Sequence, residues 1–137
     1  MNIVQLSDSL AVSGQIRPED LREIATAGYA IVVNNRPDGE EGGQPASAEM
    51  EAVARELGLE YHHMPVTAMD FPGPDFDAFS DLLDNPQQPV FAFCRSGTRC
   101  TNLWVSSREA DELDAALSTA QRLGYDLGMA AHYLARK

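Results

Sequence analysis

The sequence predicts an α/β fold in which helices flank a mainly parallel β-sheet. Short apolar runs alternate along the chain with segments that carry apolar residues at helical spacing. The runs at 29–34 and 90–93 are almost continuously apolar, which is typical of parallel strands buried on both faces. Such strands are joined by right-handed crossovers through helices. With 137 residues, the chain is expected to form a single domain that spans residues 1–137.

The first part of the chain is expected to form a strand, a helix and a second strand. Residues 10–13 are interpreted as a short edge strand. Pro18 and the two acids after it suit the first turn of a helix, and Gly28 ends that helix. After the strand at 29–34 comes a polar loop at 35–45 that is rich in turn-forming residues.

The rest of the chain continues this alternation. Ser47 is predicted to cap a helix that stops at Gly58, and a strand is expected at 60–65. The run at 90–93 follows a stretch of prolines and glutamines and is predicted to be an interior strand. Further helices are expected at 76–83, from Thr98 to Val105, at 111–123 and at 126–135.

The composition indicates a soluble protein with a strongly acidic surface. The formal net charge is −11 and the isoelectric point is about 4.5, so nucleic acids and anionic membrane surfaces would be repelled. No apolar run is long enough to span a bilayer, and the first residues lack the features of a secretory signal. We therefore expect a cytoplasmic protein that uses no cofactor and acts on a small partner. The sequence leaves the oligomeric state open.

One cysteine stands where a buried strand is predicted to end. Cys94 follows the run at 90–93, and the small residues Ser96 and Gly97 allow backbone N–H groups to turn inward before a helix begins at Thr98. A helix N-terminus and nearby arginines lower the pKa of a cysteine from about 8.5 to roughly 3.5–7.5. Cys94 is therefore predicted to be a nucleophilic thiolate.

Two further residues of the same segment are predicted to take part in its chemistry. Arg99 carries a planar fork that suits two oxygens of a tetrahedral oxyanion. Cys100 is the only other cysteine, and it lies too near Cys94 in sequence to form a structural disulfide framework. We expect it to capture an oxidised Cys94 as a reversible disulfide.

Two residues of the loop at 35–45 are candidates for the edge of the site. In parallel sheets, ligands lie beyond the carboxyl ends of the strands, and this loop leaves the sheet at the same end as Cys94. Arg36 and Asp38 are therefore candidates for substrate binding, although a solvated Pro-Asp-Gly turn explains the same residues equally well.

No metal site is predicted. His62 and His63 are neighbours in a strand and so point to opposite faces of the sheet. No third ligand stands at a useful spacing from them.

Four segments, taken together and in this order, resemble one known family. They are Ser13-Gly14-Gln15, Val33-Asn34-Asn35-Arg36-Pro37-Asp38-Gly39-Glu40, Tyr61-His62-His63-Met64-Pro65-Val66, and Cys94-Arg95-Ser96-Gly97-Thr98-Arg99 with Asn102-Leu103-Trp104. They resemble the small bacterial group of beta-lactamase hydrolase-like proteins, which is related to dual-specificity protein tyrosine phosphatases and shares their fold.

The resemblance implies roles for several residues. Cys94 would be the nucleophile, Arg99 the phosphate-binding arginine, and the amides from Arg95 to Arg99 the cradle for the phosphate. Asp70 follows the predicted strand at 60–65, where phosphatases of this fold carry the loop with their general acid, and Asp75 is its nearest rival.

The sequence also departs from the ordinary phosphatase pattern of histidine, cysteine, five residues, arginine and then a hydroxyl residue. Phe93 stands in place of the histidine, and only four residues separate Cys94 from Arg99. Cys100 takes the place of the hydroxyl residue that helps the thiolate to leave the phosphoenzyme.

Three functions therefore compete. The first is hydrolysis of a phosphomonoester through a phosphocysteine intermediate, in which Asp70 protonates the leaving oxygen. The second is sulfur transfer through a Cys94 persulfide, because a six-residue loop that begins Cys-Arg-Ser-Gly also resembles rhodanese sulfurtransferases. The third is a non-catalytic module that binds an anion.

Overall fold

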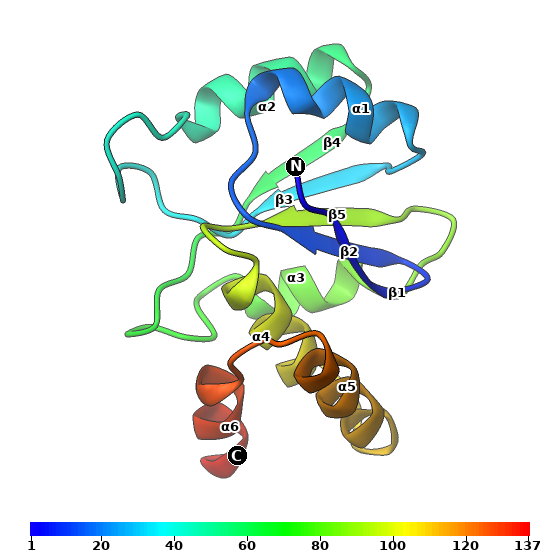
Figure 1. Ribbon diagram of the computed structural model, residues 1–137, viewed down its shortest axis with the longest axis vertical. Coiled ribbons are helices and arrows are strands. Elements are labelled where there is room, and N and C mark those ends of the chain that lie inside the picture. The colour runs from blue at the N-terminus through cyan, green and yellow to red at the C-terminus, as the bar shows by residue number, and fades with distance from the viewer.

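The computed structural model describes residues 1–137 and contains one five-stranded sheet between two layers of helices (Figure 1). The strand order is β1-β2-β5-β3-β4. Only β1 is antiparallel to its neighbour, and the other pairings are parallel. The predicted α/β fold with a parallel-rich sheet is therefore confirmed. The strands are β1 (Val4–Ser7), β2 (Leu10–Ser13), β3 (Ile31–Asn34), β4 (Glu60–His63) and β5 (Val90–Phe93).

Helices cover both faces of this sheet (Figure 1). The 3₁₀ turn η1 (Pro18–Asp20), α1 (Leu21–Thr26) and α2 (Ser47–Glu56) lie on one face. The helices α3 (Phe76–Leu82) and α4 (Thr98–Ser106) lie on the other. Outside α4, two more helices, α5 (Ala110–Arg122) and α6 (Gly128–Ala135), pack against it. No helix has the length and apolar character needed to cross a bilayer.

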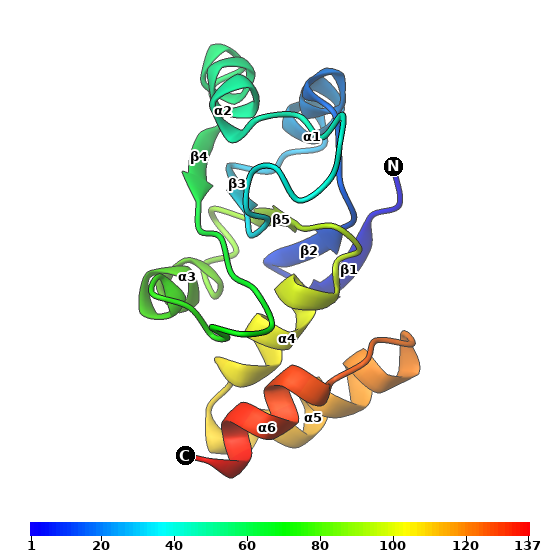
Figure 2. The same cartoon turned by 90° about the vertical axis from the view of Figure 1, so that its left-hand side faces the viewer.

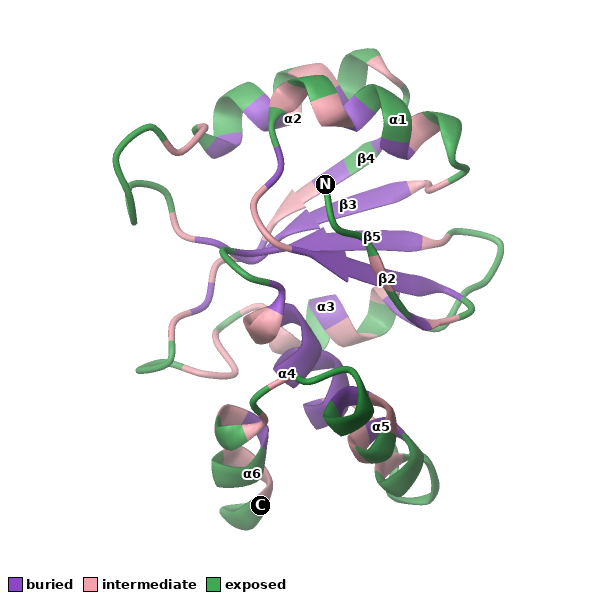
Figure 3. Cartoon of the chain, in the orientation of Figure 1, coloured by how far each residue is buried: buried purple, intermediate pink, exposed green.

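Strand alternation divides the core into two clusters, one on each face of the sheet. In β5, Val90 and Ala92 belong to the cluster beneath α3 and α4, whereas Phe91 and Phe93 belong to the cluster beneath α1 and α2. Cys94 continues the first series and is fully buried on the α4 side. Because β3 and β2 flank β5 and alternate in the same way, β5 is covered on both sides and both faces (Figure 3).

Two local predictions were wrong. Residues 10–13 do form a strand, but β2 pairs with both β1 and β5, so the edge strand is β1. The strand β1 was not predicted, although Val4–Ser7 alternates apolar and polar residues and the turn formers Asp8 and Ser9 follow it. Ser47 does not cap α2, since the Asp38 Oδ1 atom accepts a 2.8 Å hydrogen bond from the Ser47 backbone N–H.

The parallel strands all end at one edge of the sheet, and this edge positions the candidate site. The loops that follow β3, β4 and β5 leave the sheet on the left in Figure 1, and Figure 2 looks directly onto them. Buried Asn102 of α4 fixes the segment before α6 next to this edge. Its Nδ2 donates to the Asp126 carbonyl at 2.8 Å, and its Oδ1 accepts from the Ala130 N–H at 2.9 Å.

Candidate active site

Cys94 lies at the junction between β5 and α4, as predicted. The three residues between Cys94 and Thr98 form a tight turn in which Gly97 is the N-cap of α4 with a φ of 87°. The Gly97 backbone N–H points back and lies 3.1 Å from the Cys94 Sγ atom. A side chain at Gly97 would be strained at this φ, and its Cβ would also lie 3.4 Å from the Ser13 backbone. The turn therefore requires glycine.

A second glycine lets the β2 end approach this turn closely. A Cβ on Gly14 would stand 3.0 Å from the Arg95 carbonyl oxygen, which is tighter than nine in ten real Cβ contacts. The neighbouring Gln15 N–H donates to the same carbonyl at 3.3 Å. The segment after β2 thus holds Arg95, the first residue of the turn, in place. The backbone N–H groups of the turn can then face the Cys94 sulfur.

The environment of Cys94 strongly favours the thiolate. A hydrogen bond from the Cys100 side chain lowers the pKa of Cys94 to about 5, although burial opposes the shift. Hydrogen bonds from the backbone N–H groups of Cys100 and Ser96 and the positive charge of Arg99 contribute to this lowering of the pKa. At neutral pH, Cys94 therefore carries a buried negative charge that is stabilised by N–H and S–H donors.

Cys100 is the neutral partner of this thiolate. It is fully buried, and its burial, followed by its contact with negatively charged Cys94, raises its pKa well above the ordinary value. The pair therefore holds one proton and one negative charge near neutral pH, with the proton on Cys100. Both cysteines are free, with no disulfide between them.

Arg99 lies beside the thiolate, and its side chain also forms hydrogen bonds with residues of two other loops. Its Nη1 and Nη2 atoms each donate to the Glu40 carboxylate at 2.8 Å, and Nη1 also donates to the Val66 carbonyl at 3.0 Å. Hydrogen bonds from Arg99 lower the pKa of Glu40 to about 2, against a smaller opposing effect of burial and with help from Arg36. The Glu40 contact uses one edge of the guanidinium group. The Arg99 Nε–H and the second Nη2–H, which form the other edge, donate to no protein atom.

Arg36 is part of the scaffold behind Glu40. Its side chain is only 2% exposed and donates from Nε to Glu40 at 2.9 Å and from Nη1 to the Gln15 side chain at 3.0 Å. A weaker contact of 3.3 Å joins Nη2 to Glu41. Glu40 therefore bridges two arginines from different loops.

The sequence reasoning assigned no role to Glu40. The only available signal was the position of Glu40 four residues after Arg36 in a loop expected to lie next to Cys94.

The remaining residues of the turn lie on its outer side. Arg95 and Ser96 are exposed, and the Ser96 hydroxyl donates to the Thr98 hydroxyl at 3.0 Å. These hydroxyls thus bond to each other on the outer side of the turn. Asp38 lies apart from this group and holds the first turn of α2 through the contact with the Ser47 N–H.

Tyr125 is a further neighbour that the sequence reasoning missed. Its hydroxyl lies 3.5 Å from the position that a Cβ on Gly97 would occupy. Burial raises the pKa of Tyr125, while a hydrogen bond with Thr101 partly offsets this effect. Tyr125 therefore covers the α4 side of the turn.

Asp70 lies in the loop that follows β4, and this loop contacts Arg99 through Val66. The Val66 carbonyl accepts the hydrogen bond from Arg99. Asp70 itself is exposed, and its Oδ1 accepts hydrogen bonds from the Thr67 N–H at 2.7 Å and the Thr67 hydroxyl at 3.0 Å. Its second carboxylate oxygen accepts no hydrogen bond from the protein. The rival, Asp75, stands at the N-cap of α3.

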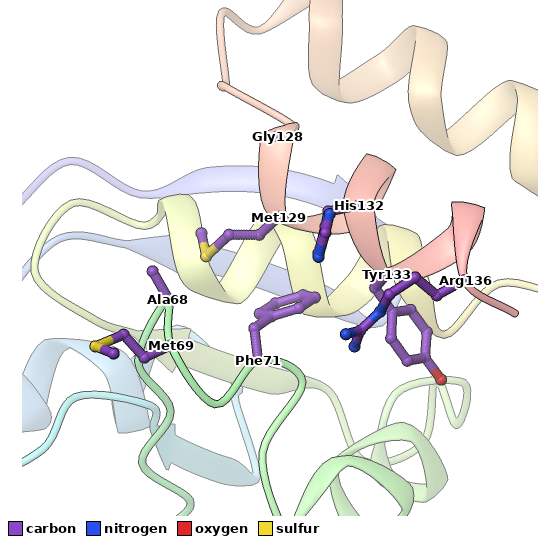
Figure 4. Close-up of a pocket in the computed structure, with 8 residues that line it drawn as sticks. All are labelled: Ala68, Met69, Phe71, Gly128, Met129, His132, Tyr133 and Arg136. Carbon is purple, nitrogen blue, oxygen red and sulfur yellow. The ribbon is translucent and has the colours of Figure 1, made fainter.

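The residue after Asp70 anchors this loop on α6. Phe71 and Tyr133 meet edge to face with ring centroids 6.3 Å apart. They line a pocket of about 270 Å³ between the loop and α6, as Figure 4 shows. Met69 lines the same pocket and is 99% exposed. The loop that carries Asp70 is thus fixed on both sides of this residue. Val66 accepts a hydrogen bond from Arg99, and Phe71 packs against Tyr133 of α6.

Sequence comparisons identify a family model and relatives that match this chain. The family model for the phosphatase-like domain of beta-lactamase hydrolase-like protein matches residues 2–111. Beta-lactamase hydrolase-like proteins of Xylella fastidiosa and Agrobacterium fabrum are 34% and 30% identical to this chain over its whole length. This chain spans about a third of the length of these relatives, since the match covers 32% of each.

Solved structures give the same fold. A Neisseria meningitidis protein described as a candidate phosphatase is 37% identical, with a TM-score of 0.78 and coverage of 93% of this chain and 92% of that one. The phosphatase Tk-PTP in its active form aligns with a TM-score of 0.70 over 98% of this chain and 93% of its own. Its identity of 19% shows a shared fold only. The fold is therefore that of the protein tyrosine and dual-specificity phosphatases, and this chain belongs to the family of phosphatase-like domains of beta-lactamase hydrolase-like proteins.

Proposed function

We propose that this domain hydrolyses a phosphomonoester through a covalent phosphocysteine intermediate on Cys94. The observation that carries the proposal is the buried Cys94 thiolate, whose pKa of about 5 is produced by donors that converge on one sulfur. A thiolate is the reactive form of cysteine and needs no separate base. Membership of a phosphatase-like family supports phosphate as the group that it attacks.

In the first proposed step, Cys94 attacks the phosphorus atom in line with the leaving oxygen. The S–P bond forms as the P–O bond breaks, and the leaving oxygen takes a proton from a general acid. Water then attacks the phosphocysteine and gives a proton to the deprotonated general acid, the S–P bond breaks, and inorganic phosphate and the thiolate are released. Both steps spread negative charge over the equatorial oxygens, and preorganised N–H donors stabilise that charge.

The free edge of Arg99 is the proposed contact for two of these oxygens. Glu40 occupies the opposite edge with two 2.8 Å hydrogen bonds, so it orients the guanidinium group without blocking its Nε–H. A bidentate contact of this kind needs the planar fork of arginine. Glu40 is therefore a positioning residue, and backbone amides between Arg95 and Arg99 complete the proposed cradle.

Cys100 has two proposed roles. Its S–H group donates to the Cys94 sulfur and so assists the thiolate as attacking and leaving group, in the place where the ordinary phosphatase pattern has a hydroxyl. The same contact makes it the proposed partner of an oxidised Cys94. Mild peroxide is therefore expected to inactivate the protein, and thiol reductants should restore its activity. Mass spectrometry of the inactive form should show a Cys94–Cys100 disulfide.

Substitution of the nucleophile tests the proposal directly. Cys94→Ser is expected to abolish phosphate release from aryl phosphates, because a serine hydroxyl is scarcely ionised and cannot form the intermediate. The melting temperature is expected to remain close to that of the parent protein. Hydrolysis at the parental rate by this variant would exclude Cys94 as nucleophile. Sulfur transfer from thiosulfate by the parent, without any phosphatase activity, would favour the persulfide mechanism.

The second prediction concerns the proton on Cys100. In Cys100→Ala the thiolate loses a donor, and the pKa of Cys94 should rise from about 5 by about one unit, which corresponds to about 1.4 kcal/mol. Cys100→Ser keeps a donor and is the matched control, with a pKa near the parental value. The ultraviolet absorbance of the thiolate, measured against pH with Cys94→Ser as blank, gives both values. An unchanged titration in Cys100→Ala would show that Cys100 does not set the pKa.

The third prediction concerns Asp70 as the general acid. Asp70→Asn is expected to slow hydrolysis of aryl phosphates with poor leaving groups by about 10²–10⁴-fold, to spare activated esters, and to flatten the alkaline limb of the pH–rate profile. Asp75→Asn makes the same change at the rival position and should behave like the parent. If the two variants exchange these behaviours, Asp75 is the acid, and if neither differs from the parent, neither aspartate takes part.

A further inference from the structure

A polar cavity adjoins the Cys94 turn on the side opposite to α6. Its volume is about 360 Å³, and no hydrophobic residue lines it. The lining comes from three loops, with Gln15 and Arg17 after β2, Arg36 and Glu41 after β3, and Arg95 in the Cys94 turn. These loops leave the edge of the sheet that faces the viewer in Figure 2.

The cavity begins one residue from the proposed nucleophile. Arg95 follows Cys94 directly, and its carbonyl oxygen accepts the Gln15 N–H at 3.3 Å. This backbone contact joins one wall of the cavity to the catalytic turn. A ligand group in the cavity would therefore lie next to the Cys94 turn, on the same edge of the sheet as a phosphate bound at Cys94.

The charge of this cavity contrasts with that of the whole chain. The protein has 21 acidic and 10 basic residues, yet three of its arginines line this cavity and Arg99 lies in the adjacent turn. Arg17 and Arg95 are exposed and form no ion pair. The only acidic residue in the lining is Glu41, which contacts Arg36 at 3.3 Å and is 58% exposed.

The third arginine is part of a rigid wall. Arg36 is 2% exposed and is held by Glu40 and Gln15, so its position does not depend on a ligand. Arg17 and Arg95 are left with unpaired guanidinium groups at a cavity that no hydrophobic residue lines. Such a site has the chemistry to bind a phosphate or a carboxylate through charge-assisted hydrogen bonds.

We propose that this arginine cavity, defined by Arg17, Arg36 and Arg95, binds a second anionic group of the substrate. The substrate is then a small phosphomonoester that carries another phosphate or a carboxylate a few bonds away from the phosphate that is removed. This inference rests on the proposed function for the phosphate at Cys94, whereas the binding of the second group depends only on the cavity.

A ladder of non-hydrolysable ligands tests the cavity without catalysis. Calorimetry would compare α,ω-alkane bisphosphonates of increasing chain length with alkylphosphonates of the same length, each titrated into the parent protein. We expect one bisphosphonate length to bind at least about tenfold more tightly than its monophosphonate, a difference of about 1.4 kcal/mol. The analogous phosphonocarboxylates show which second anion the cavity prefers.

Variants of the cavity complete the test. In the Arg17→Gln variant and in the Arg95→Gln variant, the dissociation constant of the monophosphonate divided by that of the bisphosphonate should fall about tenfold. Arg122→Gln removes the same charge from exposed α5 and should leave the ratio unchanged. Equal affinity for bisphosphonates and monophosphonates at every length, or a preference that survives both substitutions, would overturn the proposal.

The outcome separates this inference from the proposed function. If phosphate esters are not hydrolysed but the length-dependent preference is present and depends on Arg17 and Arg95, the cavity is confirmed and the proposed reaction is wrong. If simple aryl phosphates are hydrolysed but the preference is absent, the reaction stands and the cavity does not bind a second anion.

Discussion

The buried negative charge on Cys94 is the constraint on which the rest of the site depends. A thiolate without exposure to water is stable only if nearby donors replace its hydration. Here the donors are the Cys100 side chain and backbone N–H groups from a turn that Gly97 closes with a φ of 87°. The fold supplies them because β5 is an interior strand that delivers Cys94 directly to the N-terminus of α4. Burial of the sulfur and organisation of the oxyanion cradle are thus one structural requirement.

A second charge system fixes the orientation of Arg99. Arg36, Glu40 and Arg99 form a chain of ion pairs that connects the loop after β3 to the turn after β5. Because Glu40 takes one edge of Arg99, the opposite edge faces away from it with its donors unused. An exposed ion pair contributes little to stability, but this one is held against buried Arg36, whose side chain is 2% exposed. Its main consequence is geometric, since it prevents a long side chain from adopting other rotamers.

The sequence predicts the parts of this architecture that local chemistry dictates. The apolar runs identified β3 and β5, and the Cys-Arg-Ser-Gly segment identified the turn, because strand burial and glycine turns depend on adjacent residues. Glu40, Tyr125 and Asn102 were not assigned their contacts, since these depend on loops and helices that are far apart in the sequence. The strand β1 is a different case, because the alternation of apolar and polar residues in Val4–Ser7 was a local signal for it. The contact of Asp38 with the Ser47 N–H could not be predicted either, because it joins the loop after β3 to the start of α2.

The most direct test of the Cys94 site is a crystal structure of the protein with bound vanadate. A trigonal bipyramidal vanadate on the Cys94 sulfur is expected, with the turn amides on its equatorial oxygens and the Arg99 Nε and Nη2 atoms on two of them. Glu40 should keep its contact with the other edge of Arg99. Vanadate that is absent from the turn, or bound there without Arg99, would contradict the assignment of Cys94 and Arg99 to a common oxyanion site.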